Sequence, residues 1–177
     1  MINNPKISIL MNCFNGDSYL KEAVNSVIKQ SYKNWELIFW NNKSTDKSLE
    51  IISKFKDKRI KIFNSLLFTN LGEARKNAFK NSNGEYLAFL DVDDIWYEKK
   101  LEKQLEAFND RNVGICYTNT LFFSRKNKEI LYKRQRSKQL NLKTLISKYP
   151  FSLETIMLST NKIRELEYDF DSEYSHI

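Results

Sequence analysis

The chain has 177 residues, of which 41% are apolar and 14% aromatic, so it can bury a sizeable core and a disordered chain is excluded. Its four glycines and two prolines exclude collagen-like and linker-like sequence. The net charge of +7 favours anionic partners, such as phosphorylated ligands, a membrane face or nucleic acid.

The cysteine content and the hydropathy of the sequence indicate the cellular compartment of the protein. The two cysteines, Cys13 and Cys116, indicate reduced thiols rather than a disulfide framework. The N-terminus lacks the apolar core of a signal peptide, and no apolar run approaches the ~20 residues of a membrane span. These features predict a cytoplasmic protein.

Short apolar runs alternate with amphipathic segments over residues 6–109. Strands are expected at residues 6–11, 35–40, 59–63 and 85–90. Helices are expected after an N-cap at Asp17 or Ser18, over a segment with Leu49, Ile52 and Phe55 inward, and at residues 71–82 and 97–109. Gly84 is expected to close the third helix in the left-handed conformation. The alternation predicts an α/β fold with a Rossmann-like, mainly parallel sheet and helices on both faces.

The pattern changes after Val113. Residues 113–123 and 129–132 predict a β-hairpin, residues 142–146 a short helix and residues 155–158 a further strand. No linker separates this region from the first half. We therefore expect one domain over residues 1–177, with a first half at 1–110 and a smaller hairpin and helix region at 111–177.

Three of the expected strands end in polar turns. The turns carry Asn12, Asn15 and Asp17; Asn41, Asn42 and Asp46; and Asp91, Asp93 and Asp94. In parallel α/β sheets, ligands bind beyond the carboxyl ends of the strands, so these turns predict a binding site. Ordinary turn chemistry is the alternative explanation for the asparagines.

The segment Asp91-Val92-Asp93-Asp94 follows an apolar strand and places three carboxylates in four residues. Such carboxylates repel one another and weaken a purely structural turn, although capping of the next helix is an alternative. Hard oxygen ligands suit Mg²⁺ or Mn²⁺, which also bind substrate phosphates. The segment therefore predicts a divalent-metal site.

Taken together, these motifs resemble family 2 glycosyltransferases with the GT-A fold. The residues that carry the resemblance are 7–15, 19–27, 30–32, 35–38, 41–46, 71–78, 84–96 and 100–104. Residues 41–46 resemble the family's Asp-Asp-Gly-Ser-Thr-Asp turn, residues 71–78 the segment with its Arg-Asn pair, and residues 84–96 its Asp-x-Asp segment. The order and spacing of the motifs match the family over residues 6–108, so residues 1–110 are expected to be the half that binds the nucleotide sugar.

The resemblance implies a role for each matching residue. Asn12 and Phe14 would line the base pocket, with Phe14 stacking on the base, and Asn42 or Asn41 would lie where the family has an aspartate that contacts uracil. Both family aspartates of that turn are asparagine here, which can donate and accept at once.

The same resemblance places further residues beside the phosphates. Arg75 would lie near the diphosphate, although Lys76 interrupts the family's Arg-Asn pair. Asp91 would approach the ribose or the metal, Asp93 would be the chief metal ligand, and Asp94 would support the site or help to position the acceptor. The bound ion would be Mn²⁺ or Mg²⁺.

The implied reaction is transfer of a sugar with inversion. The expected donor is a nucleotide-diphosphate sugar, preferably a UDP-sugar, and the acceptor is a glycan or lipid-linked molecule in cell-surface polysaccharide synthesis. The family's base is a carboxylate after a Phe-Asp-Glu-like segment. Residues 170–173 resemble that segment, so the base is expected beyond Ile177 and the acceptor-side part is expected to be truncated. Asp169, Asp171 or Glu173 is the alternative base.

Positive charge is concentrated in the basic region Arg125–Lys148. It predicts either a solvated face or peripheral contact with the inner face of a membrane. Nucleic acid is not expected as a partner, because no nucleic-acid-binding motif accompanies the charge.

Two other function classes fit part of the pattern. Haloacid dehalogenase-like phosphatases also place an Asp-x-Asp after an apolar strand. A non-catalytic nucleotide-binding module of degenerate transferase fold would explain both the substituted asparagines and the missing base.

Overall fold

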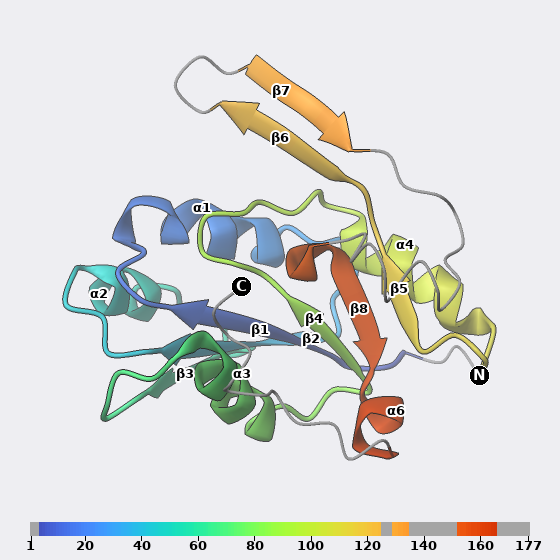
Figure 1. The fold of residues 1–177 in the computed structure, drawn as a ribbon, viewed down its shortest axis with the longest axis horizontal. Coiled ribbons are helices and arrows are strands. Elements are labelled where there is room, and N and C mark those ends of the chain that lie inside the picture. The colour runs from blue at the N-terminus through green and yellow to red at the C-terminus, as the bar shows by residue number, and fades with distance from the viewer. Residues whose placement is uncertain (1–3, 125–128, 135–151, 166–177) are drawn as a thin grey trace.

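The computed structural model describes residues 4–124, 129–134 and 152–165, and its main sheet has six strands in the order β3-β2-β1-β4-β8-β5 (Figure 1). The strands are β1 (Ile7–Cys13), β2 (Trp35–Asn41), β3 (Ile60–Asn64), β4 (Tyr86–Phe89), β5 (Ile115–Tyr117) and β8 (Ile156–Ser159). Strands β1 to β4 are parallel, whereas β8 pairs antiparallel with both β4 and β5. The predicted mainly parallel sheet is confirmed.

Helices cover both faces of this sheet, as predicted. They are α1 (Asp17–Ile28), α2 (Ser48–Ser53), α3 (Leu71–Lys80), α4 (Lys100–Leu105) and α6 (Thr160–Glu165), with 3-10 turns η1 (Glu106–Asn109) and η2 (Leu153–Thr155). Ile9 and Met11 of β1 share a core with α1, α2 and α4, whereas Leu10 shares a second core with α3 and α6. Alternation of side chains along β1 therefore builds one core on each face of the sheet.

The predicted hairpin is present, but its first strand is shorter than expected. Residues 118 and 119 interrupt the predicted strand 113–123, so β5 joins the main sheet and β6 (Thr120–Ser124) pairs with β7 (Glu129–Arg134). The hairpin projects away from the main sheet in Figure 1. The predicted helix at 142–146 lies outside the described residues.

Several local predictions were wrong in detail. α1 begins at Asp17 after Gly16, without a side-chain cap, because the Asp17 amide donates to the carboxylate of Asp46 (2.9 Å). In α2, Ile52 is buried but Leu49 is 39% exposed. The helix predicted at 97–109 is reduced to α4 and the turn η1.

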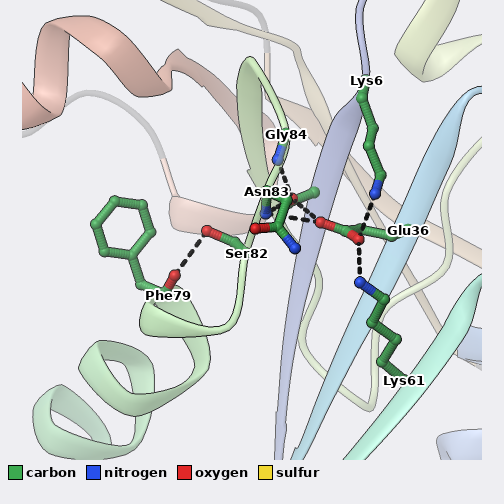
Figure 2. Close-up of polar contacts among 8 residues, drawn as sticks. Lys6, Glu36, Lys61, Phe79, Ser82, Asn83 and Gly84 are labelled. Carbon is green, nitrogen blue, oxygen red and sulfur yellow. Dashed lines mark hydrogen bonds and ion pairs between the residues drawn. The ribbon is translucent and has the colours of Figure 1, made fainter.

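A buried carboxylate ties together the amino-terminal ends of the strands (Figure 2). Glu36 of β2 accepts from Lys6 (2.6 Å) and Lys61 (2.7 Å) through one oxygen. Its other oxygen accepts from the Ser8 hydroxyl (2.6 Å) and the Asn83 amide (2.8 Å). Burial alone would raise the pKa of Glu36, but these donors lower it to about 2. The charge is therefore fully partnered, as a buried charge must be.

Gly84 lets the chain cross close to this network. Its amide donates to the Ser8 hydroxyl (2.8 Å), and a Cβ at this position would lie 2.4 Å from the Ser8 backbone nitrogen. The prediction that Gly84 ends α3 in the left-handed conformation was wrong, because α3 ends at Lys80 and no described glycine has a positive φ. The glycine is required by space, not by φ.

Candidate functional site

The turns that follow β1 and β2 lie at the carboxyl edge of the sheet and are bonded to each other. The backbone N–H of Asn15 donates to the Ser44 hydroxyl (3.1 Å), and the Asn15 side-chain oxygen accepts from the backbone N–H of Thr45 (2.8 Å). The Gly16 amide donates to the Ser48 hydroxyl (2.9 Å). These hydrogen bonds join the turn after β1 to the turn after β2, so the polar residues that make them have a structural role.

Asn41 and Asn42 are both 5% exposed and use their amides within the protein. The Asn41 side chain donates to Asn64 (3.0 Å) and accepts from the Ser44 amide (3.0 Å). The Asn42 side chain donates to the Thr69 carbonyl (2.7 Å) and accepts from the Thr69 hydroxyl (3.0 Å). The structure thus places both asparagines at the predicted edge, where they anchor the residues after β3.

Asn12 and Phe14, which were predicted to line a base pocket, lie at the same edge, at the end of β1 and directly after it. The side-chain oxygen of Asn12 is buried and has no hydrogen-bond donor among the described residues. Phe14 is 50% exposed, and its ring lies 4.6 Å from that of Phe68 at a tilt of 57°. An open acceptor and an exposed aromatic ring therefore lie at the end of β1, and Phe68 was missed by sequence reasoning.

Carboxylates gather where β4 ends. Oxygens of Asp91, Asp94 and Glu154 lie within 4.8 Å of one another, a spacing that could hold a metal ion. The Arg75 guanidinium is 4.0 Å from Asp91. Burial raises the pKa of Asp91 above 3.8; Arg75 opposes this shift, whereas Glu154 and Asp93 add to it. The cluster therefore concentrates negative charge, which an added cation would offset.

Asp93, the predicted chief metal ligand, is exposed and is not a member of this group of three carboxylates. Its charge is nevertheless near enough to raise the pKa of Asp91. The structure thus brings Asp91 and Asp94 together with a carboxylate that the sequence pattern did not indicate, and leaves Asp93 at the surface beside them.

Glu154 reaches the cluster because β8 is antiparallel to β4. Ala88 near the end of β4 pairs with Met157 at the start of β8, and Glu154 lies in η2 directly before that strand. The sequence pattern predicted the strand at 155–158 but not its partner or direction. Without the pairing, nothing in the sequence connected Glu154 with Asp91.

A cavity of about 420 Å³ opens beside the carboxylates. Asp94, Glu154 and Thr155 line it together with residues before and within α4 and residues before and within β6, which are Ile95, Trp96, Tyr97, Lys99, Lys100, Lys103, Thr118, Asn119, Thr120, Leu121 and Phe123. Lys100 lines the same cavity although its side chain is largely buried. The carboxylates therefore border a space of the size that small ligands occupy.

Comparison with known proteins places this architecture in a family. A family model described as "Glycosyl transferase family 2" matches residues 8–168. The chain belongs to this family. The GT-A fold and the enzyme class predicted from the sequence are thereby confirmed, and the phosphatase alternative is wrong.

Two relatives illustrate the similarity. An uncharacterized glycosyltransferase of Haemophilus influenzae is 34% identical over 94% of this chain and 67% of its own length. WfgD of Escherichia coli, named as a UDP-Glc:alpha-D-GlcNAc-diphosphoundecaprenol beta-1,3-glucosyltransferase, is 29% identical over 93% of this chain and 64% of its own length. This family 2 chain therefore spans about two thirds of these relatives.

Solved structures share the fold at lower identity. Residues 1–349 of S. aureus TarS in complex with UDP have a TM-score of 0.79 and 21% identity, covering 97% of this chain and 52% of that chain. The mannosyltransferase PcManGT of Pyrobaculum calidifontis, in complex with GDP-Man and Mn2+, has a TM-score of 0.72 and 14% identity, covering 99% of this chain and 51% of PcManGT.

The structure describes only part of the residues on which the predicted membrane contact and the predicted Phe-Asp-Glu-like segment depend. No helix in the described part of the chain is long and apolar enough to cross a bilayer. Most of the basic region at residues 125–148, and residues 166–177 with the predicted Phe-Asp-Glu-like segment, lie outside the described ranges.

Proposed function

We propose that this family 2 chain binds a nucleotide-diphosphate sugar, preferably a UDP-sugar, at the carboxyl edge of its sheet and belongs to an inverting, metal-dependent transferase. The observation that carries the proposal is the group of Asp91, Asp94 and Glu154, whose oxygens lie within 4.8 Å of one another beside Arg75. A diphosphate leaving group carries charge that a divalent ion and a guanidinium offset.

Each predicted site residue has a place in this proposal. Asn12 supplies an open acceptor to the base or ribose, and Phe14 supplies an aromatic face once the base displaces Phe68. Asn41 and Asn42 support the base site indirectly. Their side chains bind Asn64 at the end of β3 and the carbonyl of Thr69, and so hold the residues around the site in place.

The phosphate end of the donor would lie nearer β4. Arg75 would pair with the diphosphate, and Asp91 would hold Mn²⁺ or Mg²⁺ together with Asp94 and Glu154, with Asp93 at the surface beside them as a further ligand. The ion, when bound, neutralises charge on the leaving diphosphate. An acidic oxygen site of this kind suits hard divalent cations.

The proposed acceptor is a lipid-linked glycan of cell-surface polysaccharide synthesis. Support comes from the acceptor in the name of WfgD, an alpha-D-GlcNAc-diphosphoundecaprenol, and from TuaG of Bacillus subtilis. TuaG is named as a putative teichuronic acid biosynthesis glycosyltransferase and is 34% identical over 64% of this chain. We place such a protein in the cytoplasm, with peripheral contact at the inner face of the membrane.

Thermal unfolding with UDP, GDP and CMP, each with and without Mn²⁺, tests the proposal. A ligand that binds only the folded state raises the free energy of unfolding by about 2.7 kcal/mol at a hundredfold excess over its Kd. We expect a rise with UDP that requires Mn²⁺. A rise with GDP alone would change the donor, and no rise with any nucleotide would contradict donor binding. A rise with UDP that is equal without Mn²⁺ would favour a non-catalytic nucleotide-binding module.

A further inference from the structure

Lys100 is a buried cation without a carboxylate partner in the described part of the chain. The residue is 9% exposed; its ammonium donates to the side-chain oxygen of Gln104 (2.5 Å) and lies 4.3 Å from the centroid of the Trp96 ring. No carboxylate within the described ranges forms an ion pair with it. Burial lowers the pKa of Lys100 to about 7, against the opposing effect of Cys116 and Glu154, so an anion bound beside the side-chain nitrogen would favour its charged form.

Gln104 fixes the lysine in this arrangement. Its side-chain nitrogen donates to the Thr155 carbonyl (2.9 Å) and the Cys116 carbonyl (3.3 Å), which leaves the oxygen for Lys100. Gln104 itself is 1% exposed, so its amide has no competing water. Because Thr155 follows Glu154 directly, the same contacts hold Lys100 and the carboxylate cluster at one cavity.

The wall of the cavity contains acidic, basic and apolar side chains. Asp94 and Glu154 are acidic, and Lys99, Lys100 and Lys103 are basic. Its apolar residues include Tyr97, which is 73% exposed, and Ile95 and Phe123, which are 42% and 43% exposed. Trp96 also lines the cavity and keeps a buried indole N–H without an acceptor among the described residues.

We propose that this cavity binds the sugar-diphosphate head of a lipid-linked acceptor, with Lys100 as the ligand of the diphosphate. The sugar lies between the indole of Trp96 and the carboxylates, so that its hydroxyls face the donor site. The diphosphate meets Lys100, with Lys99 at the rim, and the first lipid carbons leave over the exposed Ile95, Tyr97 and Phe123. This inference rests on the proposed function, because the carboxylates mark the donor side only if a nucleotide sugar binds there.

Calorimetric titration of the whole chain tests the assignment with four probes. They are α-GlcNAc diphosphate carrying a short alkyl chain, the same sugar as an alkyl glycoside without phosphate, inorganic pyrophosphate, and UDP with Mn²⁺. Lys100→Met keeps the length of the side chain and removes its charge. Lys80→Met makes the same change at an exposed position on α3, across the sheet from α4.

We expect Lys100→Met to weaken binding of the sugar diphosphate at least tenfold, which corresponds to about 1.4 kcal/mol. Lys80→Met should leave it within twofold, and both variants should bind UDP with Mn²⁺ like the wild type. Equal affinity of Lys100→Met and wild type for the sugar diphosphate would overturn the proposal. So would pyrophosphate binding as tightly as the sugar diphosphate, because the cavity would then be a simple anion site.

Failure of UDP to bind in the same titrations would count against the proposed function instead, so the two failures are distinguishable. If Lys100→Met does not fold, the wild-type chain supplies the test. Acetic anhydride labelling, read by mass spectrometry, should modify Lys100 at least fivefold more slowly when the sugar diphosphate is present, with Lys80 unaffected. Unchanged labelling of Lys100 at saturating probe would refute the assignment.

Discussion

Replacement of Asp91 by asparagine should weaken Mn²⁺-dependent binding of UDP at least thirtyfold, which corresponds to about 2 kcal/mol. Asp91 is shared by the predicted metal motif and by the group of carboxylates that the structure brings together. Asparagine has nearly the same shape and keeps one oxygen, so the change removes charge and little else. Calorimetric titration of UDP with and without Mn²⁺ measures the effect.

The same variant should be more stable than the wild type when no ligand is present. Asp91 lies beside Asp94 and Glu154, the Arg75 guanidinium is 4.0 Å away, and burial together with Glu154 and Asp93 raises the pKa of Asp91. Removing one of these charges relieves repulsion, as at other sites where function opposes stability. Chemical unfolding should therefore show a higher free energy of unfolding for Asp91→Asn.

Asp110→Asn is the matched control, because Asp110 is exposed and remote in sequence from the motif, and asparagine can still accept from the Asn112 amide. It should change neither UDP binding nor stability. A variant Asp91→Asn that binds UDP and Mn²⁺ like the wild type would remove Asp91 from the metal site. Lower stability of the ligand-free variant would show that Asp91 contributes to folding instead.

Gly84→Ala should destabilise the chain by about 3 kcal/mol or more, at the upper end of the usual cost of overpacking. The new Cβ would lie 2.4 Å from the Ser8 backbone nitrogen and 2.8 Å from both the Ser8 hydroxyl and the Tyr86 carbonyl. Two of these atoms belong to strands of the central sheet and cannot move independently. The turn would therefore shift and weaken the hydrogen bonds to Glu36.

Gly114→Ala provides a matched comparison at a roomier position. Among the described residues, its added Cβ would meet only Lys162 Cδ, at 3.2 Å, which is part of a flexible side chain. Urea unfolding should show a loss below about 1 kcal/mol, in the range of ordinary surface changes. If Gly84→Ala unfolded at the same urea concentration as Gly114→Ala, close approach of the backbone would not be the reason for glycine at position 84.

Local patterns in the sequence were sufficient to predict the central sheet. The apolar runs of β1, β2 and β4 and the amphipathic face of α1 depend on neighbours a few residues apart, and the structure has them within one to three residues of the predicted bounds. The predicted 97–109 helix failed at its start because residues 97–99 form a turn before Lys100. Capping and spacing rules do not resolve that choice.

Sequence patterns predicted only the part of the site that is formed by residues close together in the sequence. Asp91 and Asp94 are adjacent to one strand and were found, but Glu154 joins them through an antiparallel pairing that no local pattern encodes. The amides of Asn41 and Asn42 had been expected to face a base, yet Asn41 contacts Asn64 through the parallel pairing of β2 with β3, and Asn42 contacts Thr69 in the segment after β3. Long-range contacts therefore decided the remaining part of the site.

The proposal on which the others depend is that a nucleotide and a divalent ion bind at the carboxyl edge of this sheet. Anomalous diffraction from a crystal grown with UDP and Mn²⁺ tests it most directly. We expect a manganese peak in contact with the Asp91 carboxylate, with the diphosphate beside Arg75 and the base against Phe14. A manganese peak away from Asp91, or UDP bound at another edge of the sheet, would contradict the account.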